Sequence, residues 1–220
     1  VIRHADAEPV TVQTVHPETD DSVFVTIDGD AFRRGIQGYT RGTRWRFAMP
    51  AWPRDLMRVI EGEYEGVARR WLRSRMNPGL DDAAFYAIEC ASGISDARRA
   101  VYAADEEAKL LGSPLAFNEL VCENRLGDMG DELRAPFTSD VPLVMIQGDW
   151  DTSTPYENAL ELAGYFTDHR LVTVAGGSHG AQREANEEVP GFRDEVLRWM
   201  RTGSYEHLPG RVELKPVPWE

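Results

Sequence analysis

Hydrophobic positions in the first third of the chain follow two successive patterns. Over residues 1–30, apolar residues alternate with polar ones in two runs separated by turn-forming residues, which predicts a β-hairpin. From 51 to 75, apolar residues recur at spacings of three and four, as on one face of a helix. Asp30 is expected to cap a further helix through Tyr39. Because this part shows no sheet core of its own, residues 1–80 are interpreted as a cap or lid segment.

After Pro78-Gly79 the pattern changes to an alternation of strands and helices. Short apolar runs predict strands over residues 84–88, 143–146 and 171–174. Helical patterns lie over residues 96–111, 114–124, 156–166 and 190–200. Apolar strands separated by helices indicate an α/β fold with a doubly wound parallel sheet. Three strands are too few for a stable sheet of this kind, so the predicted sheet is incomplete.

Composition narrows the class of protein. An apolar fraction of 42% provides for a sizeable core, and the formal net charge of -13 argues against a nucleic-acid groove or docking on an anionic membrane. No apolar run approaches the roughly 18–20 residues of a membrane span. The first residue is Val1 and not methionine, so we expect the chain to begin at a processed, cleaved or cropped end. The two cysteines, Cys90 and Cys122, are compatible with one disulfide or two thiols, and no zinc-ligand spacing occurs.

Reactive side chains follow two consecutive predicted strands. Asp149 and Asp151 come after the strand at 143–146, and His179 comes after the strand at 171–174 in a glycine-rich loop. In an open parallel sheet, functional groups gather just beyond the carboxyl ends of the strands. The order acid and then histidine is that of the last two members of an α/β-hydrolase triad.

These loops resemble the C-terminal signature of α/β-hydrolases of the tripeptidyl-aminopeptidase and proline-iminopeptidase type. The residues that carry the resemblance are Gly148-x-x-Asp151-x-x-Thr154-Pro155 and Gly177-Ser178-His179-Gly180. The stretch Ala87-Ile88-Glu89-Cys90, with Cys122 later, is similar to the segment after the cap in the tripeptidyl-aminopeptidase-like branch. The resemblance covers residues 83–202 and extends only loosely over 1–80. It implies that residues 81–220 form the C-terminal half of a hydrolase catalytic domain.

The resemblance implies a role for each reactive residue. Asp151 matches the catalytic acid of the family and His179 matches its general base. Asp149 competes for the role of acid, but the family spacing places the acid three residues after Gly148. The alternative is structural, with both aspartates forming turns and Asp151 capping the following helix.

Ser178 lies in a Gly-x-Ser-x-Gly pattern, which also describes a nucleophile elbow. We expect it not to be the nucleophile. An elbow leads directly into a helix, whereas residues 181–189 are polar and reach Pro190 first. Ser178 would also follow Asp151 and so reverse the order of the triad. No other Gly-x-Ser-x-Gly occurs, and Ser92, Ser95 and Ser153 lack that setting.

Further features are implied by the resemblance alone. It implies a disulfide between Cys90 and Cys122, and therefore an extracytoplasmic or secreted protein, with a cytoplasmic one as the alternative. It implies no metal and no organic cofactor. Candidates for binding the amino terminus of a peptide substrate are Glu61, Glu63, Glu65 and Glu89. Aromatic residues that either line a substrate pocket or pack the cap are Trp45, Phe47, Trp52, Tyr64 and Trp71.

The predicted function is a serine hydrolase that acts by acyl transfer, cleaving short peptides from the N-terminus. A carboxylic-ester hydrolase with the same triad is the first alternative, and a non-catalytic α/β module that binds a partner is the second. The three strands are expected to be the last of an eight-stranded sheet. The expected partner is the N-terminal portion of the same hydrolase, present as a second chain. It should carry the Gly-x-Ser-x-Gly serine and dock along the strand at Ala84–Ile88.

Overall fold

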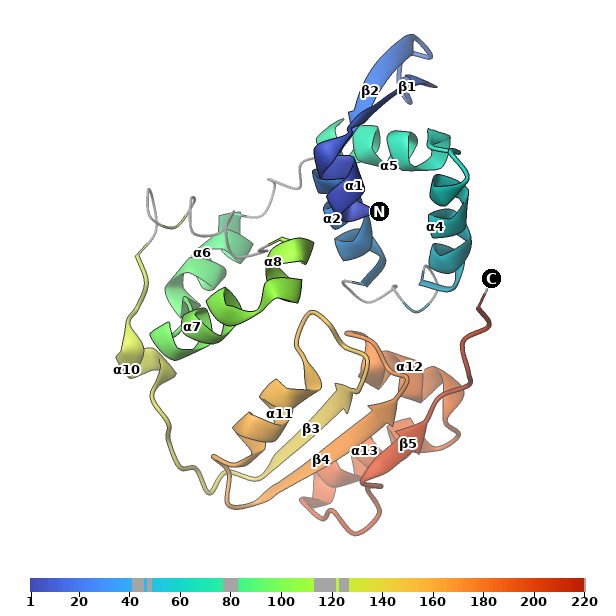
Figure 1. Ribbon diagram of the computed structural model, residues 1–220. Coiled ribbons are helices and arrows are strands. Elements are labelled where there is room, and N and C mark those ends of the chain that lie inside the picture. The colour runs from blue at the N-terminus through green and yellow to red at the C-terminus, as the bar shows by residue number, and fades with distance from the viewer. Residues whose placement is uncertain (41–45, 47–48, 77–82, 113–121, 123–126, 220) are drawn as a thin grey trace. The chain divides into compact units, whose positions relative to one another are not determined.

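The computed structural model describes residues 1–40, 46, 49–76, 83–112, 122 and 127–219 (Figure 1). The chain forms two compact units. Unit 1 comprises Val1–Gly35 and Val59–Pro136, and unit 2 comprises Ile36–Arg58 and Phe137–Glu220. Unit 1 therefore includes residues on both sides of position 80, and the assignment of residues 1–80 as a cap stays a prediction.

The predicted hairpin is confirmed at the start of unit 1. Helix α1 (Ile2–Ala7) precedes strands β1 (Val10–Val15) and β2 (Ser22–Ile27), which pair antiparallel. Helix α5 (Glu65–Met76) contributes Ala68 and Trp71 to the core that forms around the hairpin. The buried members of this core are Ala5, Val25, Ile27, Ala31, Phe32, Val59, Ala68 and Trp71.

The predicted helices of the first third are present, with two differences. Helix α2 spans Gly29–Thr40, and its cap is Asp28 and not Asp30, because Asp28 Oδ1 accepts a hydrogen bond from the Ala31 amide at 3.0 Å. The helical stretch at 51–75 is divided into η1 (Met49–Ala51), α4 (Trp52–Ile60) and α5. Gly62, with φ of 89°, lies at the break between α4 and α5.

The predicted strand at Ala84–Ile88 is wrong. These residues lie in helix α6 (Ala83–Ser92). A short apolar run does not distinguish a buried strand from a helix with one buried side. Here Cys90 is buried while Ile88 and Glu89 are exposed, as expected for a helix that packs on one side.

The rest of unit 1 contains three further described helices. The predicted helix at 96–111 is confirmed as two helices, α7 (Asp96–Ala104) and α8 (Glu106–Leu111). Asp105 separates them and caps α8 by accepting hydrogen bonds from two backbone amides. A further short helix, α10, spans Asp131–Arg134. The predicted helix at 114–124 lies outside the described residues except for Cys122.

The disulfide between Cys90 and Cys122 is confirmed, and it links residues 32 positions apart. Replacing both cysteines with alanine should lower the free energy of unfolding of unit 1 by roughly 3–4 kcal/mol, because the unfolded chain loses a cross-link that closes a loop of this size. Guanidinium denaturation of the oxidised wild type and the double variant measures the difference. A double variant as stable as the oxidised wild type would contradict the prediction.

Unit 2 contains a three-stranded parallel sheet in the order β3-β4-β5. Strands β3 (Leu143–Gly148) and β4 (His169–Ala175) confirm the two predicted strands that precede the reactive loops. The third strand is β5 (Arg211–Glu213), which the sequence analysis missed. Its three residues have one apolar member, Val212, between two charged ones, so it has no detectable hydrophobic pattern.

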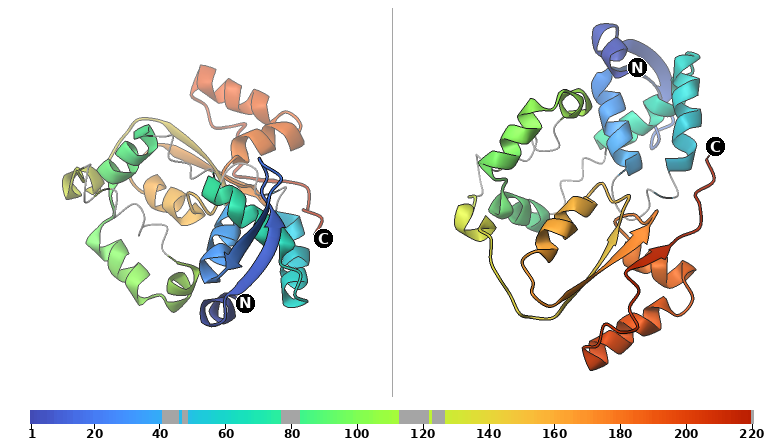
Figure 2. Two further views of the ribbon diagram at one scale, coloured as in Figure 1. Left: turned by 90° about the horizontal axis from the view of Figure 1, so that it is seen from above. Right: turned by 60° about the horizontal axis from the view of Figure 1, so that its bottom comes forward.

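Helices cover both faces of this sheet (Figures 1 and 2). Helix α11 (Tyr156–Ala163) lies on one face, and helices α12 (Ala181–Glu188) and α13 (Phe192–Thr202) lie on the other. The Tyr156 hydroxyl bonds Thr173 on the α11 face at 2.7 Å, whereas the neighbouring Val172 and Val174 are buried against α12 and α13. This core comprises Val172, Val174, Ala181, Ala185, Phe192, Val196, Leu208, Val212 and Leu214. Parallel strands between helices make unit 2 an α/β structure.

The outer edge of β3 is open in the described part of the chain. Leu143 donates its backbone N–H toward the β4 side, to the carbonyl of Asp168. By the alternation of a parallel ladder, the backbone groups of Val144 and Ile146 therefore face the other edge, where no described strand pairs. Both residues are only half-buried, although they pack against the core of unit 2.

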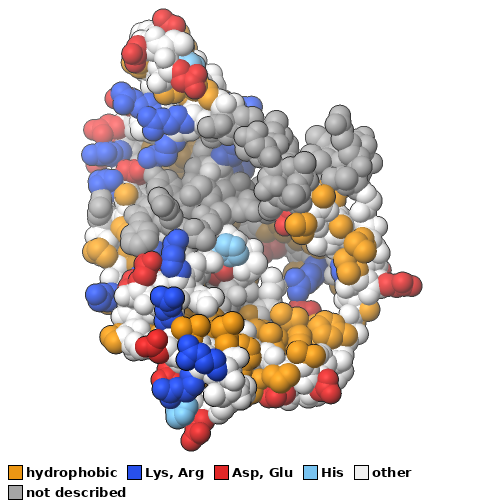
Figure 3. All heavy atoms as spheres, turned by 180° about the vertical axis from the view of Figure 1, so that it is seen from behind, with side chains coloured by type: hydrophobic (Ala, Val, Ile, Leu, Met, Phe, Trp, Pro, Cys, Tyr) orange, Lys and Arg blue, Asp and Glu red, His pale blue; other side chains and the backbone are white. Residues whose placement is uncertain are grey.

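Figure 3 shows hydrophobic side chains gathered in a band over unit 2. None of the described helices combines the length and the apolar character needed to cross a membrane.

Candidate active site

The two reactive loops lie side by side because their backbones are bonded to each other. β3 ends at Gly148 and β4 ends at Ala175, and beyond them the Asp149 amide donates to Val174 at 3.2 Å and the Trp150 amide donates to Gly177 at 3.1 Å. A Cβ at Gly148 would collide with the carbonyl oxygen of Gly177. Glycine is therefore required at position 148 for the loops to approach this closely.

Asp149 serves to hold the two loops together. Its Oδ1 accepts a hydrogen bond from the Gly176 amide at 2.7 Å, and its Oδ2 lies 3.6 Å from the Arg211 guanidinium of β5. Gly176 has φ of 71°, so the loop after β4 turns sharply where Asp149 holds it. The competing aspartate is thus bonded to loop backbone, and the neighbouring Asp151 is the one that contacts the histidine.

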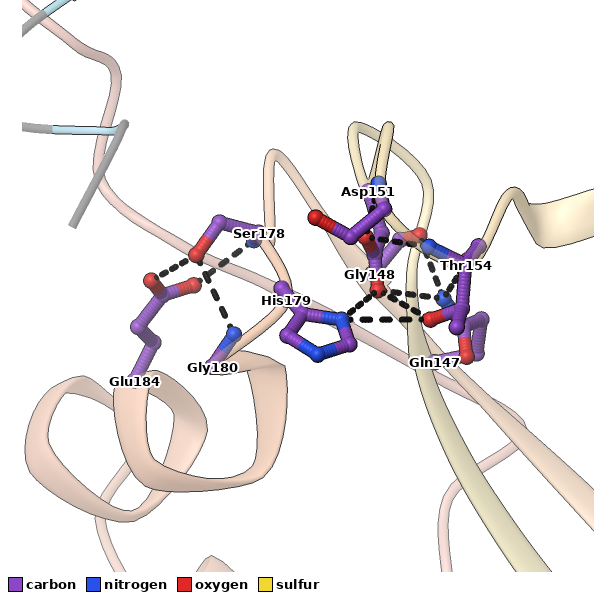
Figure 4. Close-up of polar contacts among 9 residues, drawn as sticks. Gln147, Gly148, Asp151, Thr154, Ser178, His179, Gly180 and Glu184 are labelled. Atoms are coloured by element: carbon purple, nitrogen blue, oxygen red, sulfur yellow. Dashed lines mark hydrogen bonds and ion pairs between the residues drawn. The ribbon is translucent and has the colours of Figure 1, made fainter. Parts of the chain in front are cut away.

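Asp151 is a buried carboxylate with a full set of hydrogen-bond donors (Figure 4). Its Oδ1 accepts from the amides of Ser153 at 2.8 Å and Thr154 at 3.0 Å. Its Oδ2 accepts from the Thr154 hydroxyl at 2.7 Å, from Gln147 Nε2 at 3.0 Å and from His179 Nδ1 at 2.9 Å. Burial alone would raise the pKa of Asp151, but the hydrogen bonds from Thr154, His179 and Ser153 outweigh it, and the pKa lies below its usual value. The group is therefore held as an anion.

The hydrogen bonds of His179 define its tautomer. Ionised Asp151 only accepts, and the Thr154 hydroxyl is already donating to Asp151, so the shared partner His179 Nδ1 must carry a proton. The other ring nitrogen, Nε2, is then an acceptor in the neutral ring. No described residue bonds Nε2, and the side chain is 40% exposed while that of Asp151 is 4% exposed. The pair thus leaves Nε2 free to accept a proton from a group outside the described residues, while Nδ1 donates to the buried Asp151 carboxylate.

The sequence analysis assigned no role to two residues that bond this pair, Thr154 and Gln147. Thr154 belongs to the Gly148-x-x-Asp151-x-x-Thr154-Pro155 motif. Thr154 orients both members of the pair, since its hydroxyl donates to Asp151 and lies 3.2 Å from His179 Nδ1. Gln147, on β3, bonds the Asp151 carboxylate and also the Thr154 carbonyl at 2.8 Å. Asp151 followed by Ser153 and Thr154 is turn-forming chemistry, which marks the loop but not the role of the Thr154 hydroxyl.

Ser178 has its hydroxyl turned away from the His179 ring. Figure 4 shows Ser178 pointing toward Glu184 while the ring of His179 points toward Asp151. Ser178 is fully buried, and its hydroxyl donates to a Glu184 carboxylate oxygen. The expectation that no helix follows this loop directly is wrong, because helix α12 begins at Ala181. Four of the eight residues of α12 are charged, so the polarity of the segment did not indicate a helix with buried alanines.

The remaining predicted site residues lie in unit 1 or outside the described residues, apart from Trp52, which begins α4 in unit 2. Glu61, Glu63, Glu65 and Glu89 are all exposed, and Glu65 pairs with Arg69 at 2.6 Å. Their role in binding a substrate amino terminus stays a prediction. Trp71 and Tyr64 pack in or against the core of unit 1, and Trp45 and Phe47 lie outside the described residues.

The comparison with protein families matches the part of the chain that holds these loops. Residues 109–211 match the α/β-hydrolase family model described as TAP-like protein. The match supports a TAP-like C-terminal portion of an α/β-hydrolase over this segment. The TAP-like segment contains Asp151, His179 and Glu184, together with β3, β4 and the helices that cover them. Comparisons with curated proteins and with solved structures found no match.

The low pKa of Asp151 predicts a pH-dependent contribution to stability. In the unfolded chain the carboxyl should titrate near its usual value of 3.8, and in the folded chain its pKa is lower. The contribution is therefore fully present above the unfolded pKa and is lost as the pH falls through the folded one. Urea denaturation at a series of pH values below 5 should show a steeper acid loss of stability for the wild type than for Asp151→Asn. Identical pH dependence in the two proteins would contradict this assignment.

Proposed function

We propose that this chain supplies the acid and the base of a serine hydrolase that works by acyl transfer. The observation that supports it best is the 2.9 Å hydrogen bond from His179 Nδ1 to buried Asp151, with Nε2 left to accept a proton. Asp151 and His179 come in the order in which α/β-hydrolases carry their acid and base. The match of residues 109–211 to a hydrolase family supports the same reading.

In the proposed reaction, the serine oxygen attacks the carbonyl carbon of the substrate while His179 Nε2 takes the serine proton. The same proton then passes from Nε2 to the leaving amine or alcohol as the acyl–leaving group bond breaks. Water attacks the acyl-enzyme next, giving its proton to Nε2, and the serine leaves with that proton. Asp151 remains ionised throughout, holds Nδ1 protonated and stabilises the imidazolium that forms twice per cycle.

The nucleophile is proposed to come from an N-terminal portion of the same hydrolase. The Gly-x-Ser-x-Gly at residues 176–180 is the single instance in the sequence, and its Ser178 is buried against Glu184. The proposed docking place moves from Ala84–Ile88, which is helical, to the open edge of β3. No described strand pairs with the backbone groups of Val144 and Ile146, and such an edge suits an added strand. The resulting doubly wound sheet, with residues 1–80 as its cap, belongs to this proposal.

A fluorophosphonate probe tests the proposal on the complete hydrolase. Labelling of one serine, located by mass spectrometry of the digested protein, should occur on a Gly-x-Ser-x-Gly peptide other than residues 176–180. His179→Ala should abolish the labelling. If no serine is labelled, the chain is better explained as a non-catalytic partner-binding module. If Ser178 is labelled, the proposed origin of the nucleophile is wrong.

The proposed substrates are short peptides, cleaved from the N-terminus. The TAP-like match supports a peptidase, and a carboxylic-ester hydrolase uses the same acid and base. Comparing turnover of a tripeptidyl anilide with that of a short acyl nitrophenyl ester separates the two, and turnover of the ester alone would exclude the peptidase. The disulfide supports an extracytoplasmic or secreted location.

A further inference from the structure

The loop that carries His179 is anchored by a second buried carboxylate. Glu184, in the first turn of α12, is 2% exposed, and Ser178 is fully buried beside it. Glu184 Oε2 accepts a hydrogen bond from the Ser178 amide at 2.8 Å, and Oε1 accepts one from the Ser178 hydroxyl. Burial of a carboxylate is unfavourable unless such bonds compensate for lost hydration. Ser178 and Glu184 therefore act as one bonded pair.

This pair fixes the chain on both sides of His179 (Figure 4). Ser178 comes immediately before the histidine, and its Oγ also accepts from the Gly180 amide, immediately after it, at 3.2 Å. The Ser178 carbonyl accepts from Ala181 at 2.9 Å, and the Glu184 amide donates to Gly180 at 3.0 Å. The backbone of His179 thus cannot shift without disturbing bonds that Glu184 completes.

The distribution of buried carboxylates points the same way. Among the residues that the structure describes, the buried carboxylates are Asp151 and Glu184. Asp151 bonds the ring of His179, and Glu184 bonds the residue before it. Both buried carboxylates thus lie around one short loop, where hydrogen bonds compensate for their lost hydration.

We propose that Glu184 is a positioning residue for His179. Acting through Ser178, it holds the imidazole where Nδ1 donates to Asp151 and where Nε2 meets the reacting serine. The proposal rests on the proposed function, since positioning matters only if His179 is the base. In the described structure, the Glu184 carboxylate bonds Ser178 and not the imidazole ring. A displacement of a reacting group by about 1 Å costs about 100-fold in rate, so loss of this anchor should be visible in kcat.

The first test is proton NMR of the complete hydrolase, which reports on the His179 ring without requiring turnover. The wild type should show a slowly exchanging His179 Nδ1 proton, assigned by its loss in His179→Ala. Glu184→Ala should broaden or abolish this signal. Glu187→Ala, which removes an exposed glutamate of the same helix, should leave it unchanged. Val196→Ala, which weakens the same core away from the loop, controls for loss of stability. An unchanged signal in folded Glu184→Ala would overturn the proposal.

The second test is steady-state kinetics of the complete hydrolase. Glu184→Ala should lower kcat by roughly 10–100-fold at a nearly unchanged KM. Glu184→Gln should recover most of this loss, because its amide oxygen accepts the Ser178 N–H and its nitrogen donates to the Ser178 hydroxyl. Val196→Ala should retain kcat at temperatures where it is folded. Equal kcat values for the wild type and Glu184→Ala would overturn the positioning role.

Two outcomes separate this proposal from the proposed function. If His179→Ala retains activity, the proposed function fails, whatever the NMR signal shows. If a serine is labelled and His179→Ala is inactive, but Glu184→Ala keeps both kcat and the Nδ1 signal, only the positioning role fails. Should Glu184→Ala not fold, Ser178→Ala decides, since it removes the hydroxyl bonds and keeps the backbone bond. It should lower kcat several-fold, and an unchanged kcat and Nδ1 signal would overturn the proposal.

Discussion

Replacing His179 with alanine should lower kcat/KM of the complete hydrolase by roughly 10⁴–10⁶-fold. The side chain provides the nitrogen that takes the serine proton and returns it to the leaving group. In the alanine variant the serine would have to attack as a neutral hydroxyl, with no base in place. Its stability should change little, because the ring is 40% exposed and its removal leaves Asp151 with the donors of Ser153, Thr154 and Gln147.

His207→Ala is the matched control, since it removes an exposed histidine of unit 2 whose Nε2 lies 4.0 Å from a Glu206 carboxylate oxygen. This variant should keep wild-type kcat/KM. Hydrolysis of a tripeptidyl anilide and of an acyl nitrophenyl ester should be measured for both variants, with circular dichroism to check the fold. A folded His179→Ala protein with wild-type turnover of either substrate would exclude His179 as the base.

The sequence predicted the strands in which apolar residues either alternate with polar ones or form an uninterrupted run. The strands β3 and β4 and the first hairpin have such patterns, and all are present. The strand at Ala84–Ile88 was predicted from five residues, a length at which a helix and a strand are equally compatible with apolar side chains. Strand β5 exists because Val212 fits the core while its neighbours form ion pairs, which no local pattern reveals.

The sequence predicted which loops form the site, but it did not predict most of the side-chain contacts within those loops. Parallel strands bring the loops after β3 and β4 to one edge of the sheet, so Asp151 and His179 were expected to be neighbours, and they are hydrogen-bonded. Their catalytic roles stay predictions. The contacts of Gln147 and Glu184 depend on side-chain rotamers and on the turn at Gly176. A charged residue on a polar helix gives no sign in the sequence that it is the one turned inward.

Replacing Asp151 with asparagine should lower kcat by about 10⁴-fold while leaving the protein folded. The asparagine oxygen can still accept the amides of Ser153 and Thr154, so the loop keeps its shape. Its NH₂ group then faces His179 Nδ1 and donates to it. The imidazole proton moves to Nε2, and the nitrogen that should accept the serine proton is no longer a base.

Asp149→Asn is the control that separates the two neighbouring aspartates. The asparagine oxygen at 149 can still accept the Gly176 amide, and the ion pair that is lost, with Arg211, is partly exposed and 3.6 Å long. Such pairs contribute at most about 1 kcal/mol to stability, so kcat should stay within a few-fold of the wild type. Single-turnover measurements with an acyl nitrophenyl ester would show the effect on acylation directly. If Asp149→Asn were the damaging variant and Asp151→Asn were silent, the acid would be Asp149, and Asp151 would be a turn former that caps the helix after it.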